Sequence, residues 1–552
     1  SHSRLQLGSA LSFVGTLVVN SGTYWSGLGG TVDLSAGTLE SSGGTLSLDQ
    51  FTTGANTAFK LSGNTEISSS DNMTFGSLDL GGNRLTLGTG SAGMTLPNTL
   101  TMDNASSAIE TKNVNLTLGK ALSLTSGSIT STGGTFTLYQ GGTLGSSGIL
   151  DVSGTTLKLG DNLSAENGTL TSNPASLTNT SVLHLLDDVT LTFNGGIFFK
   201  ALEHNGYTLT LDGGEYDSLK LVDPLTLNAG TLHTQGTGLN LHGALTLQNN
   251  SLIDSTGGML ALMKGGTVDN SSELDVPGTR LHLRGLPLRT TITGTLSTDT
   301  GTEIEWMYGG MIDLSGGLLK LGGDLNLGGT VTDNDTRLIL QADATLGNSK
   351  NYGETQLATG IGSLDLNGSA LTISMPLIVN DTLTLDAAGE KIVTGTADLY
   401  LNGGISATAG TLSSTGGTLG LPGGATLATG SIFSTSNTTL NLGGSLEVAD
   451  TWTSDNTSVS LTTDNASLSS TVALSLASLQ TNGYDFELAS ATSDLTIENA
   501  FALSGGETLS TQGADLIFKK SADISSGSTL DASGGGKLEF QLGGTDNGTI
   551  NA

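Results

Sequence analysis

The sequence predicts an all-β protein whose chain coils as a right-handed parallel β-helix, or β-solenoid, with about 20 residues in each turn. Three observations lead to this prediction. Short segments that alternate apolar with small polar residues run through the whole chain, glycine-rich turns separate them, and the pattern returns at nearly constant spacing. We call one turn of the coil a rung, and we expect each rung to hold about three short strands.

The strand pattern is clearest in residues 45–48, 135–138 and 245–247, where Leu or Phe alternates with Ser or Thr. Alternation with a period of two is typical of a strand with one buried face. We therefore expect the apolar side chains to stack in columns inside the coil, and Ser, Thr, Asn and Asp to face water. The predicted interior positions are Leu39, Leu46, Leu48, Ile129, Leu138, Leu232, Leu239, Leu241, Leu412, Leu419 and Leu421.

Between the strands lie Gly-Gly, Asn-Gly and Asp-Asn steps, which supply the positive φ angles that tight turns need. Gly133-Gly134 and Gly416-Gly417 are expected to occupy equivalent corners, with at least one positive φ in each pair. Asn and Asp at successive corners are expected to stack as side-chain ladders. No segment has the pattern of an amphipathic helix.

The spacing of the strands indicates stacked rungs. The motif Gly-Thr-Leu-x-Ser-x-Gly-Gly-Thr-Leu-x-Leu starts at Gly37 and Gly410, and variants start at Gly127, Gly148 and Gly168, which are 21 and 20 residues apart. A repeat of this length cannot bury a face alone, but stacked neighbours can bury one together. An array of β-sandwiches is the alternative, and it predicts a period of about 100 residues without the shorter one.

A longer period lies above the rungs. Residues 131–135 recur as 414–418, an offset of 283, and Gly389-Glu390 recurs as Gly506-Glu507, an offset of 117. We expect one continuous rod, a segment of a longer array, made of several modules. The predicted modules are 1–76 (a partial first module), 77–200, 201–362, 363–477 and 478–552 (a truncated last module).

Composition restricts the function. The chain carries 19 basic and 50 acidic side chains, a net charge of −31, and it has no cysteine. Nucleic acid is therefore not an expected partner, because phosphate binding needs clustered Lys and Arg. Thiolate metal sites and a Cys nucleophile are excluded, and no apolar run is long enough to span a bilayer. The negative charge indicates solubility, and the alternative is loose binding of divalent cations between chains.

Residues that could carry chemistry do not form a recognisable pattern. The six histidines, His2, His184, His204, His233, His242 and His282, lack metal-ligand spacing on a helix. We predict no catalytic, cofactor or metal site, and hence no enzyme. The alternative is a β-helical carbohydrate-active enzyme, a polysaccharide lyase or hydrolase, which would need clustered carboxylates beside Arg or Lys in a cleft.

One basic cluster interrupts the acidic sequence. Aligning residues 279–283 with the next rung, 302–306, places Arg280 beside Glu303 and His282 beside Glu305, all facing outward. Parallel rungs lie ~4.8 Å apart, within reach of an ion pair. We predict a structural charge ladder between the rungs, which fixes their register. The rival hypothesis is a docking patch for an acidic glycan or a neighbouring acidic chain.

Four further residues form a candidate contact patch: Tyr24 and Trp25, near the start of the chain, and Arg284 and Arg289, which belong to the basic cluster. The aromatic pair would serve as a contact or as a cap of the coil. The two arginines are the remaining cations of the cluster after the ladder is formed.

The rungs that begin at Gly37 and Gly410, together with strands of the form Asn-Gly-x-x-Leu-Thr-Leu, resemble repeat regions of large exported bacterial proteins. These are the filamentous-haemagglutinin-like adhesins and the autotransporter passengers. The resemblance covers essentially the whole chain and implies export, a right-handed β-helix, and a role in adhesion or as a spacer. We therefore expect a secreted bacterial structural or adhesive protein, extracellular or on the cell surface, that associates with itself or with a surface glycan or protein.

Overall fold

The computed structural model describes residues 9–20, 30–165, 167–172, 180–214, 216–284, 289–307, 311–326, 330–331, 335–347, 359–464, 466–489 and 494–551. The described residues form strands joined by turns and contain no helix. They divide into two units. Unit 1 comprises residues 1–288 with 307–310, and unit 2 comprises residues 289–306 with 311–552.

In both units the chain is a parallel β-solenoid with about 21 residues per turn, as the spacing of the motif predicts. In unit 1, Leu39 pairs with Phe59 and Leu232 with Ile253, each one rung further along. In unit 2, Leu412 pairs with Phe433 in the same way. Side chains at equivalent positions of successive rungs therefore lie above one another.

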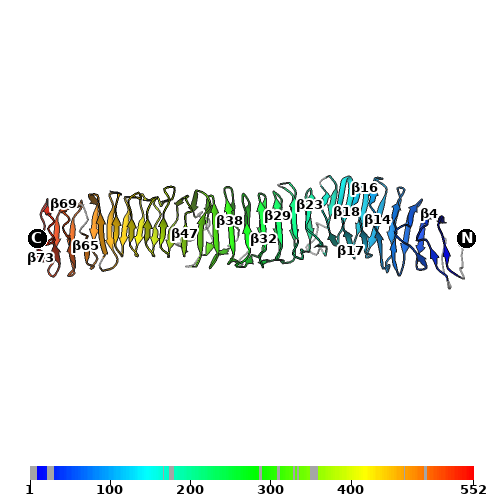
Figure 1. Ribbon diagram of the computed structural model, residues 1–552, viewed down its shortest axis with the longest axis horizontal. Coiled ribbons are helices and arrows are strands. Elements are labelled where there is room, and N and C mark those ends of the chain that lie inside the picture. Colours follow the sequence, from blue (N-terminus) through cyan, green and yellow to red (C-terminus); the bar gives the residue numbers. More distant parts are fainter. Residues whose placement is uncertain are drawn as a thin grey trace. The chain divides into compact units, whose positions relative to one another are not determined.

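Unit 1 contains a seven-stranded sheet whose strands follow one another rung by rung (Figure 1). An interior column in this sheet runs through Met94, Leu116, Phe136, Leu157 and Leu183, each paired with the next. All five side chains are buried. The strands are β9 (Asn72–Thr74), β12 (Gly93–Leu96), β15 (Leu116–Leu118), β17 (Thr135–Leu138), β19 (Thr156–Leu159), β22 (Val182–Leu185) and β25 (Ala201–Glu203).

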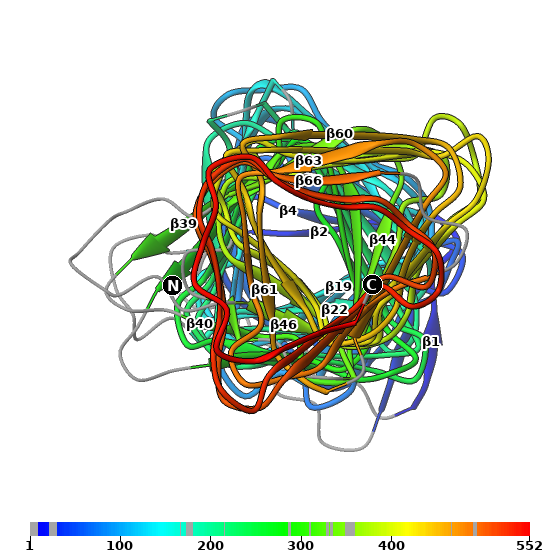
Figure 2. The ribbon, with the colours of Figure 1, turned by 90° about the vertical axis from the view of Figure 1, so that its left-hand side faces the viewer.

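Unit 2 shows three strands per rung. Its consecutive strands enter three sheets in turn, of seven, seven and nine strands, and its turns overlie one another in the end-on view (yellow to red in Figure 2). One rung consists of β48 (Ala370–Ile373), β49 (Leu377–Val379) and β50 (Leu383–Leu385), and the next of β51 (Lys391–Val393), β52 (Leu399–Leu401) and β53 (Ile405–Ala407). The next two rungs are β54 (Thr411–Ser414), β55 (Thr418–Leu421), β56 (Ala425–Leu427) and β57 (Ile432–Ser436), β58 (Thr439–Leu442), β59 (Leu446–Val448).

The interior positions predicted from alternation are confirmed. All eleven, from Leu39 to Leu421, are at most 2% exposed. Aromatic side chains stack within a column where Phe518 lies on its register partner Phe540, with ring centroids 5.2 Å apart. Phe59 and Phe75, at 4.8 Å, and Phe501 and Phe518, at 5.1 Å, also stack, although they are not register partners. The apolar columns are thus continuous from rung to rung, which removes apolar surface from water at every strand.

The expectation that Ser and Thr face water is wrong at a set of interior corners. Thr111, Ser131 and Thr155 are fully buried, and the hydroxyls of Thr111 and Thr155 donate to the Ser131 hydroxyl at 2.7 and 2.9 Å. In unit 2, Thr438 donates to Ser414 at 2.9 Å. A hydroxyl can enter the interior because the equivalent hydroxyl of the neighbouring rung satisfies its hydrogen bond.

The corners have the predicted backbone. Gly134 and Gly417 have φ of 69° and 67°, which confirms the positive φ expected in each Gly-Gly pair. Asparagine ladders are also present: the Asn249 amide donates to the Asn228 side chain at 2.7 Å, and Asn456 donates to Asn437 at 2.7 Å. Carboxylates extend the ladders, because Asp398 accepts the backbone N–H of Thr418, 20 residues later, at 2.6 Å.

A recurring two-residue turn has both residues at positive φ, as in a type I′ turn. Nine pairs of consecutive described residues have positive φ at both positions. Four of these turns lie a few residues after the predicted module starts near 77, 201, 363 and 478. In three of these four turns the Asn side chain donates to a carbonyl of the preceding rung, at 2.9 to 3.2 Å. The four turns are Gly81-Gly82, Asn205-Gly206, Asn367-Gly368 and Asn482-Gly483.

Candidate functional site

The predicted charge ladder involves β36 (Arg280–Arg284) and β39 (Glu303–Met307). Burial alternates along both strands as expected: Arg280, Glu303 and Glu305 are exposed, while Leu281 and Ile304 are buried. His282 is half-buried. β36 belongs to unit 1, while Glu303 and Glu305 of β39 belong to unit 2, so the ion pairs Arg280–Glu303 and His282–Glu305 stay a prediction.

The candidate contact patch lies outside the described side chains. Tyr24 and Trp25 are not among the described residues, and Arg284 and Arg289 are described only as members of their strands. Their role as a contact surface therefore also stays a prediction.

Hydrogen-bonded pairs of a histidine and a carboxylate on adjacent rungs do occur at residues that the sequence did not single out. His184 on β22 pairs with Glu203 on β25, with Nδ1 and Oε2 2.5 Å apart. His233 on β29 (Thr231–Gln235) pairs with Asp254 on β32 (Leu252–Thr256), with Nδ1 and Oδ2 2.9 Å apart. In both cases the two residues are direct partners in the strand register, so polar side chains of the outward face do bond from rung to rung.

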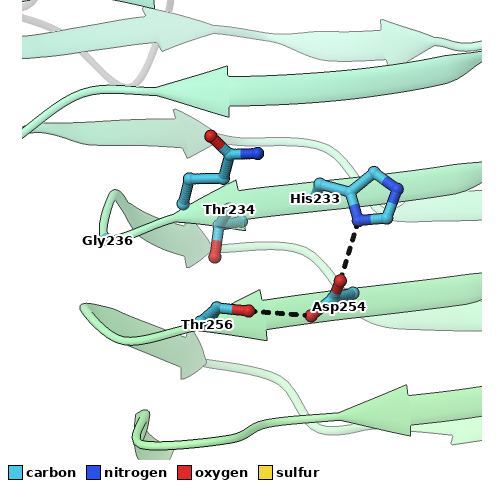
Figure 3. Close-up of a pocket in the computed structure, with 6 residues that line it drawn as sticks. His233, Thr234, Gly236, Asp254 and Thr256 are labelled. Carbon is cyan, nitrogen blue, oxygen red and sulfur yellow. Dashed lines mark hydrogen bonds and ion pairs between the residues drawn. The ribbon is translucent and has the colours of Figure 1, made fainter.

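The His233–Asp254 pair lines a recess with a volume of about 360 Å³ that is partly open to solvent. Figure 3 shows Asp254 between His233 and Thr256. The Thr256 hydroxyl donates to Asp254 Oδ1 at 3.0 Å while His233 holds the other carboxylate oxygen. The residues that line the recess are His233, Thr234, Gln235, Gly236, Asp254 and Thr256.

Local sequence explains this geometry. Alternation turns Leu232, Thr234, Ile253 and Ser255 inward, where all four are buried, and it leaves the other side chains of the two strands on the outer face. β29 ends at Gln235, and Gly236, with a φ of 73°, begins the corner. Gly236 lines the recess, and a Cβ there would meet only the Gly213 carbonyl oxygen, at 3.9 Å.

The arrangement does not match a catalytic triad, in which the hydroxyl hydrogen-bonds the imidazole and the carboxylate orients it. Here the hydroxyl of Thr256 bonds the carboxylate instead. The lining also includes one carboxylate, Asp254, whereas glycoside hydrolysis by acid–base catalysis uses a pair. The side chains of the recess are therefore arranged for hydrogen bonding, and not for catalysis by a triad or by a pair of carboxylates.

A second histidine, His204, is 5% exposed. The backbone N–H groups of Gly206 and Asn228 each lie 3.0 Å from one of its ring nitrogens. Gly230 leaves room for the ring, since a Cβ there would lie 2.3 Å from Nδ1. Burial lowers the pKa of His204, so this imidazole is a neutral structural group at pH 7.

Comparison with models of protein families, with curated proteins and with solved structures gives no match. The solenoid fold and the side chains described above are therefore the basis for any functional conclusion.

In the part of the chain that the structure describes, no three His, Asp or Glu side chains gather closely enough to hold a metal ion. The same part contains no helix suited to crossing a membrane.

Proposed function

We propose that this chain is a secreted bacterial structural protein that builds an elongated rod, filament or stalk outside the cell and serves in adhesion. The observation that supports the proposal best is the constancy of the register. In unit 2 one sheet carries nine successive strands. Each rung pairs with its neighbour as the previous one did, and stacking of this kind adds ~4.8 Å of length per rung with no built-in limit.

The outer face supports a passive role as well. Some of its polar and charged residues bond between rungs, as in the pairs His184–Glu203 and Lys519–Glu498, and such pairs favour one register of the coil. The absence of cysteine suits an export substrate that crosses a membrane unfolded, and a net charge of −31 disfavours nucleic acid as a partner. The partners we propose are further copies of the chain, or a glycan or protein on a surface.

The resemblance of the repeated rungs to filamentous-haemagglutinin-like adhesins and autotransporter passengers agrees with this proposal. A location outside the cell or on its surface is part of the same proposal. Labelling intact producing cells with an antibody against the chain tests the location, because a surface protein is labelled without permeabilisation and an internal one is not.

Electron microscopy of native material tests the function. We expect long filaments or stalks. Compact single particles that degrade an acidic polysaccharide would contradict the proposal and favour a β-helical lyase or hydrolase instead. The polysaccharide assay is run on the same preparation. Compact particles without activity indicate that assembly failed, whereas compact particles with activity indicate an enzyme.

A further inference from the structure

The recess beside His233 has fixed hydrogen-bonding polarity. A carboxylate can only accept, so His233 Nδ1 must carry the hydrogen of the 2.9 Å bond to Asp254. In the neutral ring Nε2 is then an acceptor, but Figure 3 shows it directed away from Thr256 and Gly236 as well as from Asp254. The Thr256 hydroxyl donates its hydrogen to Asp254 Oδ1, at 3.0 Å. The Thr256 oxygen therefore also remains as an acceptor.

Two acceptors are thus oriented by one carboxylate on adjacent strands. The side chains of His233 and Asp254 are 33% and 30% exposed, so they are accessible yet held in place. Gln235 is exposed and contributes an amide, which can both donate and accept. The Thr256 oxygen and the Gln235 amide suit a ligand that carries several hydroxyl groups close together.

Size and charge narrow the ligand class. Ligand pockets span about 300–1,000 Å³, and about 360 Å³ fits a single ring rather than a longer chain. The chain carries 50 acidic against 19 basic side chains, and no Lys or Arg lines the recess, so an anionic ligand is disfavoured. A neutral molecule rich in hydroxyl groups remains.

We propose that this recess binds one ring of a neutral sugar, with Thr256 Oγ1 accepting a hydrogen bond from one of its hydroxyls and the Gln235 amide bonding another. Gly236 provides the space for the ring. The inference rests on the proposed adhesive function, because the recess would be the place where the rod contacts a glycan. It concerns only residues of unit 1.

Saturation-transfer NMR tests the proposal, with the methyl glycosides of glucose, galactose, mannose and N-acetylglucosamine as probes. We expect at least one probe to bind. Thr256→Val keeps the shape and removes the acceptor, so binding should weaken about tenfold, the effect of one lost hydrogen bond. Gly236→Asn fills the recess and should abolish binding, while Asn tolerates the positive φ.

Gly316→Asn is the matched control, because Gly316 has the same φ of 73° and a Cβ there would meet nothing within 4 Å. This variant should bind as the unchanged chain does. Absence of binding by all four probes, or binding that survives Gly236→Asn, would overturn the proposal. If Gly236→Asn fails to fold, Thr256→Val decides alone.

Electron microscopy of the same samples separates the two proposals. Filaments without sugar binding would refute the sugar site and leave the rod intact. Sugar binding by compact particles would support the sugar site and refute the rod.

Discussion

Two buried glutamates show how single residues close the corners of the coil. Glu390 and Glu507 are 4% and 3% exposed and lie 117 residues apart. Glu390 accepts backbone N–H groups from Asp386, at 2.7 Å, and from Gly368 on the preceding rung, at 3.3 Å. Glu507 accepts from Ser504 at 2.5 Å and from Gly483 at 2.6 Å. A buried carboxylate is tolerated here because it satisfies backbone donors of two rungs.

Replacing Glu507 with Ala should therefore destabilise the protein. The change leaves two partly buried N–H groups without their acceptor, which costs about 1–3 kcal/mol. A urea unfolding series measures the loss. Glu487→Ala, at an exposed position of β65 (Phe486–Leu488), is the control and should change stability by no more than about 0.5 kcal/mol. Equal losses in the two variants would contradict a capping role for Glu507.

His204 predicts a pH dependence of stability. Burial lowers its pKa in the folded state, so the unfolded chain binds this proton more readily, with a pKa of about 6.5. The contribution is complete above that pH and is lost as the pH falls below it, by at most about 1.4 kcal/mol per pH unit. Carboxylates such as Glu498, whose pKa is lowered from 4.5 by the hydrogen bond from Lys519, act only in a more acidic range.

Thermal melts between pH 5 and 7.5 check this, with His204→Gln as the comparison. The variant should be less stable at pH 7.5 but should lose the part of the slope between pH 5 and 6.5 that His204 contributes. An unchanged slope would show that another group titrates there.

Sequence alone could not predict these residues. Periodicity identifies which positions face inward, and general rules place Glu and His in water, so buried Glu390, Glu507 and His204 were not expected. The pairs of a histidine and a carboxylate were missed for a different reason. His184 and Glu203 are 19 residues apart whereas His233 and Asp254 are 21 apart, so partners depend on the length of each corner. The recess at Gly236 depends on the same detail.

At the scale of the element, the Asn-Gly turn combines two roles. Asn482 has a φ of 55°, and its side-chain amide donates to the Leu461 carbonyl of the preceding rung at 2.9 Å. The backbone needs a residue that tolerates positive φ, and the ladder needs an amide. Asn provides both, which explains why the pattern Leu-x-x-Asn-Gly marks this corner at residues 202–206, 364–368 and 479–483.

Two substitutions separate the roles. Asn482→Gly removes the ladder bond and keeps the backbone relaxed, so we expect a loss of about 0.5–1.5 kcal/mol. Asn482→Ala adds the strain of positive φ, about 1–2 kcal/mol more. Denaturant unfolding of both variants measures the difference. If Ala is tolerated as well as Gly, the positive φ is not a constraint at this corner.

At the scale of the whole molecule, the sequence predicted the fold class and the rung length because both follow from periodicity. The alternation of apolar and polar residues predicted which side chains face the interior. The interval between motifs predicted the number of residues in one rung. The rung of about 21 residues differs from the expected 20 because corners vary in length, as where Leu338 pairs with Leu364. The net charge of the chain is a further property of the whole molecule, and it follows directly from the composition.

That charge predicts how copies of the chain interact. With a net charge of −31 at pH 7 and an isoelectric point near 4.2, copies repel one another at neutral pH. The range of repulsion falls from ~30 Å at 0.01 M salt to ~8 Å at 0.15 M. Light scattering should therefore show self-association that increases with NaCl at pH 7 and is strongest near pH 4.2, where the repulsion vanishes.

MgCl₂ at matched ionic strength distinguishes screening from bridging by divalent cations between acidic chains. Equal effects of the two salts confirm screening. A much stronger effect of Mg²⁺, reversed by a chelator, would show instead that the acidic surface binds cations between neighbouring copies.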